Sequence, residues 1–163
     1  MPRKSLEPRE ILSILATTPD RFAAGADGLE AERCRTTPSF GGWSLNEVLG
    51  HLRSCQDVWG DAIRAILDRD VPTIRAMDPR TWIQRTDYLG LDFRTSLAAF
   101  SARRDEQVEE LASLSPAQWA LGAVVIGAGK PLSRTVRTYA AWMARHERSH
   151  YRQIQRAADD VRG

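Results

Sequence analysis

Three histidines are the residues of this chain best suited to chemistry, and two of them, His146 and His150, lie four residues apart. In a helix, side chains at positions i and i+4 project from one face, so both imidazoles can turn toward one point. Metal–nitrogen bonds of about 2.0–2.1 Å require ligand nitrogens roughly 3–3.5 Å apart, which two such rings can reach. With His51 as a third ligand, a bound divalent transition metal would keep a coordination position for water or a small-molecule substrate.

The donor atoms do not select the metal, because neutral imidazole suits zinc, nickel, copper and iron alike. There is also an ordinary alternative, in which each histidine is a core or helix-edge residue held by one hydrogen bond. All three histidines occupy positions that lean toward the apolar side of a helix. This pattern favours a shared site, but on the residues alone both interpretations stay open.

The segment from Ser133 to Val161 is predicted to be one long helix, since it contains no Gly or Pro and Ser133 can act as the N-cap. At about 100° per residue, the side chains separate into an inward face and an arginine face. The inward face consists of Val136, Tyr139, Met143, His146, His150, Ile154 and Ala157. The arginine face consists of Arg145, Arg148, Arg152 and Arg156. We interpret the arginine face as exposed to solvent, with phosphate binding as the alternative.

A second helix is predicted to begin after Ser44, which forms a capping-box pair with Glu47. Trp43, just before it, is expected to be a hydrophobic staple and not a platform for substrate. His51 lies at the margin of the apolar face of this helix. That face runs to about Leu67 and consists of Leu45, Val48, Leu49, Leu52, Cys55, Trp59, Ile63 and Ile66.

Two further helices are expected, one from Pro8 to about Ala26 and one from about Asp87 to Leu114. The first should kink or restart at Pro19, which cannot donate a backbone hydrogen bond. The predicted connections are residues 28–42, residues 70–86, whose length is typical of lids and binding loops, and the glycine-rich residues 123–132, which we expect to be irregular. Four helical segments with long connections predict an all-α four-helix bundle that forms a single domain over residues 1–163.

Composition narrows the classes of partner. The 23 basic and 21 acidic residues give a net charge of +2, too small to indicate a nucleic-acid or membrane partner. We find no apolar run of the roughly 18–20 residues that span a bilayer, and no signal-peptide core at the N-terminus. Two cysteines, Cys34 and Cys55, make no disulfide framework, so a reducing cytoplasm is the expected location.

Two segments carry a family pattern: residues 43–52 have the sequence W-S-L-N-E-V-L-G-H-L, and residues 144–154 have the sequence A-R-H-E-R-S-H-Y-R-Q-I. With the F-x3-R pair at Phe100 and Arg104, they resemble the DinB/YfiT-like superfamily. Its signature elements, W-S-x-x-E-x-x-x-H and H-x3-H-x2-Q, both occur here in the right order. The resemblance implies a four-helix bundle with a three-histidine metal site. Its ligands here would be His51, His146 and His150.

The chain departs from the superfamily pattern after the first histidine. Members often carry an acidic residue there, whereas Ser54, Cys55 and Gln56 occupy that stretch here. A carboxylate as fourth ligand or general base is therefore in doubt. We interpret Cys55 as a small packed hydrophobe, with a role as ligand or reactive thiol as the alternative.

Two further polar residues are candidates for the site. Gln153, close to His150 on the same predicted helix, would either hydrogen-bond a ligand or a metal-bound water, or be a polar residue at the helix edge. Arg104 lies on an apolar stripe and would need a carboxylate partner if buried. A structural salt bridge is the interpretation we favour for Arg104, and binding of an anionic substrate is the alternative.

The resemblance implies a metal-dependent transferase or hydrolase that activates a low-molecular-weight thiol or water against a small-molecule electrophile. Zinc, nickel or iron would be the metal. The oligomeric state is left open, with a homodimer as a candidate because dimers are common among similar proteins. The alternative is a non-catalytic, stress-associated metal-binding bundle that acts through dimerisation or a partner.

Overall fold

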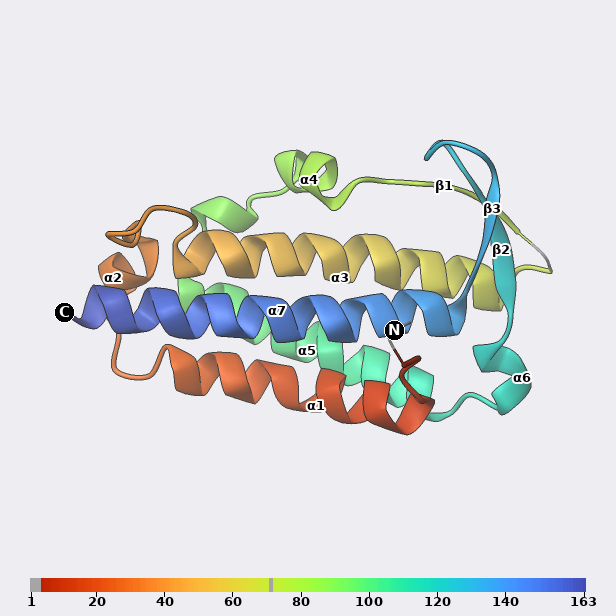
Figure 1. The fold of residues 1–163 in the computed structure, drawn as a ribbon, viewed down its shortest axis with the longest axis horizontal. Coiled ribbons are helices and arrows are strands. Elements are labelled where there is room, and N and C mark those ends of the chain that lie inside the picture. The colour runs from red at the N-terminus through yellow and green to blue at the C-terminus, as the bar shows by residue number, and fades with distance from the viewer. Residues whose placement is uncertain (1–3, 71) are drawn as a thin grey trace.

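Four long helices lie side by side in the computed structural model, which describes residues 4–70 and 72–163 (Figure 1). They are α1 (Pro8–Gly25), α3 (Leu45–Asp68), α5 (Phe93–Ala112) and α7 (Val136–Arg162). The short elements are α2 (Ala31–Arg35), α4 (Pro79–Trp82), α6 (Pro116–Trp119) and the 3-10 turns η1 (Ile83–Arg85) and η2 (Tyr88–Gly90). The predicted four-helix bundle is confirmed.

The connection between α3 and α5 runs back along the outside of α3, as Figure 1 shows. α3 has 24 residues and is therefore about 36 Å long. Because α5 begins at the same end of the bundle as α3, the chain must cover that length between them. The connection does so with β1 (Thr73–Arg75), α4, η1 and η2. Its length, noted in the sequence, thus has a topological reason, and it places a layer of loop over α3.

The prediction of an irregular connection over residues 123–132 is wrong, because this segment forms most of a β-hairpin. Strand β2 (Gly122–Ile126) pairs antiparallel with β3 (Leu132–Thr135) and parallel with β1, in the order β1-β2-β3. Ala123 and Val125 are buried and Val124 is exposed, the alternation of a half-buried strand. Gly127 and Gly129, with φ of 87°, form the turn between the two strands. The glycine content of this segment had led to the prediction of an irregular loop. The sheet is small and covers one end of the bundle.

Helix starts follow the capping residues, and two differ from the prediction. Ser44 and Glu47 form the predicted capping box, with the Ser44 hydroxyl 3.2 Å from the Glu47 backbone nitrogen. α7 begins at Val136 with Thr135 as N-cap, because Ser133 belongs to strand β3. α5 begins at Phe93 because Asp92 caps it, and the residues before it form the turn η2.

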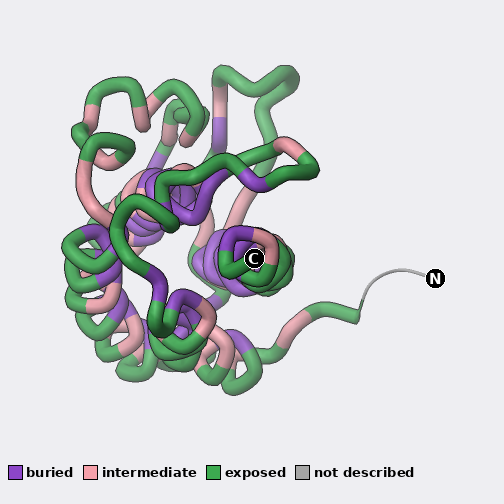
Figure 2. The backbone as a smooth tube through the Cα atoms, turned by 90° about the vertical axis from the view of Figure 1, so that its left-hand side faces the viewer, coloured by how far each residue is buried: buried purple, intermediate pink, exposed green. Residues whose placement is uncertain are grey.

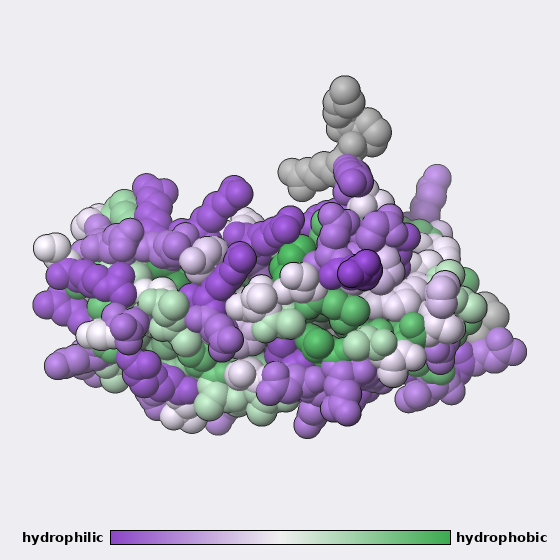
Figure 3. Space-filling model, turned by 90° about the horizontal axis from the view of Figure 1, so that it is seen from below, coloured by the Kyte–Doolittle hydropathy of each residue, from purple (hydrophilic) through white to green (hydrophobic). Residues whose placement is uncertain are grey.

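Two apolar clusters, one at each end of the bundle, form the core, and Figure 2 shows the buried parts of the helices turned largely toward one another. The cluster near α2 includes Phe22, Leu45, Leu49, Phe93 and Ile154. The cluster near the hairpin includes Leu15, Ile63, Leu111, Val136 and Met143. Along each long helix, a buried polar residue lies between the two groups: Thr18, Gln56, Arg104 and Glu147. Outside, hydrophilic side chains cover much of the face seen in Figure 3, with apolar patches between them.

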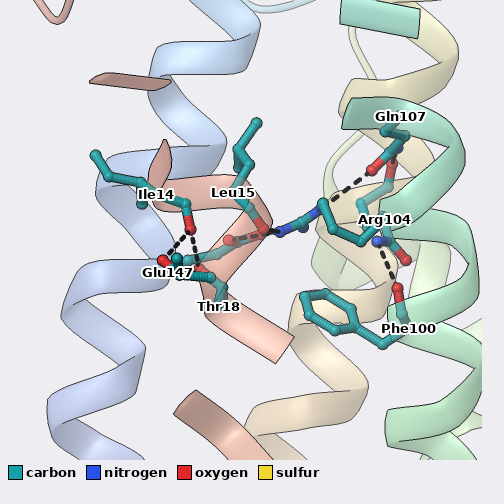
Figure 4. Close-up of polar contacts among 9 residues, drawn as sticks. Ile14, Leu15, Thr18, Phe100, Arg104, Gln107 and Glu147 are labelled. Carbon is teal, nitrogen blue, oxygen red and sulfur yellow. Dashed lines mark hydrogen bonds and ion pairs between the residues drawn. The ribbon is translucent and has the colours of Figure 1, made fainter. Parts of the chain in front are cut away.

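Arg104 is the centre of this polar layer and is fully buried. Its Nη1 donates to Glu147 Oε2 at 2.9 Å, Nη2 donates to the second carboxylate oxygen, and the guanidinium lies 4.7 Å from the Phe100 ring centroid (Figure 4). Gln107 accepts from Nε of Arg104 at 3.4 Å and donates to the Gln56 carbonyl at 3.2 Å. Arg104 thus joins α5 to α7 through a paired, hydrogen-bonded charge, and no solvent reaches it.

Pro19 lies inside α1, which neither stops nor restarts there. Proline has no backbone N–H, so the carbonyl of Leu15, four residues earlier, loses its usual donor. The Nη1 of Arg104 supplies a replacement at 3.0 Å. Next to it, Thr18 Oγ1 donates to the Ile14 carbonyl at 2.8 Å. The helix continues through Pro19 because a side chain from α5 satisfies the freed carbonyl (Figure 4).

Candidate metal centre

The structure brings all three histidines together about midway along the bundle. His51 comes from α3, and His146 and His150 come from consecutive turns of α7. The Nε2 of His146 lies 3.2 Å from that of His51 and 3.0 Å from that of His150. These separations fall in the range that ligand nitrogens of one metal ion occupy. His51 is buried and the other two rings are half-buried, so the cluster is at the wall of the bundle and not sealed inside it.

Gln153 decides which nitrogen of His150 carries the proton. Its Oε1 lies 2.6 Å from Nδ1 of His150, and a carbonyl oxygen only accepts, so Nδ1 donates. A neutral imidazole with its proton on Nδ1 has a bare lone pair on Nε2, and that nitrogen faces His146. A lone pair directed at a cluster of other ring nitrogens is stabilised by a cation at their centre. The donor set therefore fits a divalent metal.

Burial keeps the cluster neutral. It is the main cause that lowers the pKa of His51 to about 4 and that of His146 to about 3, from an ordinary value near 6.5. The nearby His150 and the Arg80 guanidinium lower both pKa values further. Burial also lowers the pKa of His150, against the opposing effects of Gln153 and Glu147. At neutral pH all three rings therefore present uncharged nitrogens, the form that binds metal.

Cys55 joins this cluster one turn beyond His51. The ligand atoms of His51, Cys55 and His146 all lie within 4.8 Å of one another, and Cys55 Sγ is 3.6 Å from His51 Nε2. Burial, followed by the charge of Glu147, raises the pKa of the thiol well above its usual range. In the metal-free protein Cys55 is a buried, protonated thiol that lies within reach of a metal, so both interpretations of this residue stay open.

Two tryptophans hold the rings, and sequence reasoning assigned neither of them to the site. Trp43 lies over the cluster: its ring is stacked parallel to His150 at 6.3 Å and tilted against His51 at 5.1 Å. Trp59 meets His146 edge-on at 5.2 Å. The spacing of Trp59 from His51, two helical turns, was the available signal. Trp43 is 37% exposed, so the cluster has one side near solvent.

The returning connection places one charge, that of Arg80, near the cluster. Ser54 Oγ donates to the Pro79 carbonyl at 2.5 Å, which holds α4 against α3. Trp82 Nε1 donates to Asp57 Oδ2 at 3.2 Å and fastens the next turn. Arg80, at the start of α4, is thereby kept close enough to lower the pKa values of the histidines. The predicted binding loop thus packs beside the candidate site.

Of the other candidate residues, Gln153 contacts a site histidine, whereas Arg104 is engaged with Glu147 and does not face the cluster. The arginine face of α7 is only partly free. Arg148 and Arg152 are exposed, but Arg145 donates to the Lys4 carbonyl at 3.0 Å and Arg156 lies 4.2 Å from the Phe40 ring centroid. The latter two contacts tie α7 to neighbouring segments of its own chain.

The fold and the cluster together define a four-helix-bundle protein with a His–Cys–His group of potential metal ligands. A sequence model of the DinB superfamily matches residues 14–154. The chain belongs to the DinB superfamily. No curated protein matches it in sequence.

Solved structures share this fold. YfiT from Bacillus subtilis, described as a probable metal-dependent hydrolase with an unusual four-helix bundle topology, matches with a TM-score of 0.80 and 19% identity, over 98% of this chain and 91% of its own. A Streptococcus pneumoniae protein matches with a TM-score of 0.70 and 13% identity, over 98% and 93%. An uncharacterised protein from Clostridium difficile 630 matches with 0.64 and 13%, over 94% and 98%. At these identities the likeness shows the fold alone.

No helix in the described part of the chain has the length and apolar character needed to cross a membrane. Both cysteines, Cys34 and Cys55, are free and buried.

Proposed function

We propose that the chain is a metal-dependent enzyme in which His51, His146 and His150 hold a zinc, nickel or iron ion. The reaction would be hydrolysis of a small electrophile, or transfer of a low-molecular-weight thiol to it. The observation that carries this proposal is the approach of the Nε2 atoms of His51 and His150 to within 3.0–3.2 Å of the Nε2 of His146, with the proton of His150 fixed on its Nδ1. Membership of a superfamily that includes YfiT supports it.

Each residue of the cluster has a defined part. A bound divalent ion would lower the pKa of water or of a thiol, which makes a nucleophile available at neutral pH. Gln153 holds the His150 ring in orientation, and Trp59 buttresses His146. Glu147, the carboxylate next to His146, is paired with Arg104. The chain thus positions and neutralises its histidines but offers no carboxylate in the ligand cluster as a general base.

Metal analysis of the purified protein tests the proposal first. We expect wild type to bind about one divalent ion per chain after reconstitution and dialysis, and His146→Ala to bind far less. A screen of thiol–electrophile pairs and hydrolysable esters follows, with turnover expected to disappear in His150→Ala. Equal, negligible metal in wild type and His146→Ala would refute the proposal. Metal binding without turnover in the screen would favour the non-catalytic alternative.

One observation favours that second candidate, a non-catalytic metal-binding bundle. Metal bonds of about 2.1 Å to nitrogen and 2.3 Å to sulfur place tetrahedral N and S ligands about 3.6 Å apart, and Cys55 Sγ is 3.6 Å from His51 Nε2. A fourth ligand from the protein would close the site, as in structural centres. Such a bundle would act through a dimer or partner contact, in the reducing cytoplasm that its free thiols favour.

Cobalt-substituted protein distinguishes an open site from a closed one. Thiolate ligation to Co(II) gives a near-ultraviolet charge-transfer band, which a site of three histidines lacks. We expect no such band in wild type, because the proposed site has three histidine ligands and an open position, and we expect unchanged spectra in Cys55→Ser. Cys34→Ser, which removes the other buried thiol, is the matched control. A band that disappears only in Cys55→Ser would show a closed site and replace the enzymatic proposal.

A further inference from the structure

A cavity of about 240 Å³ lies beside the histidine cluster, between α3, α7 and the layer formed by β1 and the following loop. Trp59 belongs to both, since its ring lines the cavity and also meets His146 at 5.2 Å. Tyr139, Trp82 and Met77 also line the cavity. Flat aromatic walls and a volume below that of pockets for drug-sized ligands suit a small, planar, apolar body.

Arg134, from strand β3, gives this cavity a charged wall. Its guanidinium lies 4.6 Å from the ring centroid of Trp142 and 5.9 Å from that of Tyr139, so the group is held in place by aromatic faces. Its Nε is buried and has no hydrogen-bond partner among the described residues. Buried donors are nearly always paired, so an unpaired one that lines a cavity calls for an acceptor from outside the chain.

The charge of the cavity is not balanced by the protein. Arg75, from β1, lines the same space, and within residues 4–70 and 72–163 neither it nor Arg134 forms a salt bridge. The acid at the rim, Asp61, is 3.5 Å from Arg103 and so is already paired. A planar guanidinium with free N–H edges matches a carboxylate, which it can bind through two parallel hydrogen bonds.

We infer that this cavity binds a small carboxylic acid with a flat, apolar body. The carboxylate is held by Arg134, the body lies among Tyr139, Trp82 and Met77, and the far end reaches the Trp59 wall beside the histidines. That this molecule is the substrate of the metal centre rests on the proposed function; that it binds here does not.

Titration calorimetry with benzoate, on full-length protein treated with a chelator, tests binding apart from the metal. We expect benzoate to bind and benzamide, its neutral isostere, to bind at least tenfold more weakly. The Arg134→Gln variant should bind benzoate at least tenfold more weakly than wild type. Arg148→Gln, which changes an exposed arginine of α7, should leave benzoate binding unchanged. The benzoate–benzamide comparison on wild type keeps the test valid even if Arg134→Gln fails to fold.

The inference would be overturned by no benzoate binding, by equal binding of benzamide, or by benzoate binding that folded Arg134→Gln retains. Phenyl phosphate is the third probe, and binding of it without benzoate would overturn the carboxylate assignment. His150→Ala should bind benzoate as wild type does, since the cavity does not include His150. Loss of binding in that variant would place the anion on the histidines instead. Failure of the metal analysis leaves these expectations unchanged, so the two proposals fail separately.

Discussion

The carbonyl oxygen of Gln153 lies 2.6 Å from Nδ1 of His150, and this contact fixes both the tautomer and the orientation of the ring. Partners of this kind outside the ligand shell change metal affinity by about 10–100-fold when removed. We therefore expect the Gln153→Leu variant to bind zinc about 10–100-fold more weakly than wild type in a competition titration with a chromophoric chelator. Gln155→Leu is the matched control, because Gln155 is exposed and bonds only the hydroxyl of Tyr151. Equal affinities in both variants would contradict the role of Gln153.

The free energy of unfolding should decrease in acid, over a pH range set by the pKa values of the histidines. The pKa of His51 is lowered to about 4 and that of His146 to about 3, so below pH 6.5 the unfolded chain binds protons that the folded chain does not. Stability is therefore fully present above about pH 6.5 and decreases as pH falls toward 4 and 3. Denaturant melts of metal-free protein from pH 7.5 to 4.5 measure this slope.

The double variant His51→Gln/His146→Gln should show a shallower slope over the same range, because two of the groups that cause it are gone. An identical slope in the variant would assign the acid sensitivity to other groups.

The buried pair of Arg104 and Glu147 should dominate local stability. Removing one partner from a buried pair leaves an uncompensated charge and costs about 3–5 kcal/mol. We expect Arg104→Met and Glu147→Met each to lose stability of that order in urea melts. The double variant should lose much less than the sum, because neither charge remains. Additive losses would show that the two side chains act independently.

Arg104→Met also deprives the Leu15 carbonyl of its donor. Adding Pro19→Ala restores a backbone N–H at the position that normally serves that carbonyl. The second substitution should therefore recover part of the stability lost by the first. In wild type, where Arg104 already serves the carbonyl, Pro19→Ala should have less effect.

Because Gly60 has no side chain, the Gln107 amide can pack against the surface of α3. A Cβ at this position would lie 2.4 Å from Nε2 of Gln107, which is buried and hydrogen-bonded to the Gln56 carbonyl. Gly60→Ala should displace that amide and lower the unfolding free energy by about 1–3 kcal/mol, the cost of an unsatisfied buried group. Gly25→Ala is the control, since its Cβ would meet only Ile154 at 3.5 Å. A Gly60→Ala protein as stable as Gly25→Ala would contradict this account.

Much of this protein follows from local sequence. The capping box at Ser44 and Glu47 and the apolar period of α3 and α7 predicted these two helices, because such signals act within a few residues. Together with the two further helical segments and the long connections, they predicted the bundle. The i, i+4 spacing of His146 and His150 likewise predicted that their rings could face one point, and the structure brings them together with His51. Whether a metal binds there is still a prediction.

Other features depended on contacts between distant segments. Strand β2 of the hairpin at residues 122–135 also pairs with β1, some fifty residues earlier in the chain, whereas the glycines of this segment alone suggested an irregular loop. The Leu15 carbonyl, which Pro19 leaves without its usual donor in α1, accepts a hydrogen bond from Arg104 of another helix. Local sequence sets which faces are apolar and where helices start, whereas the satisfaction of buried polar groups such as Arg104 depends on which elements meet. That is the part the tertiary structure decided.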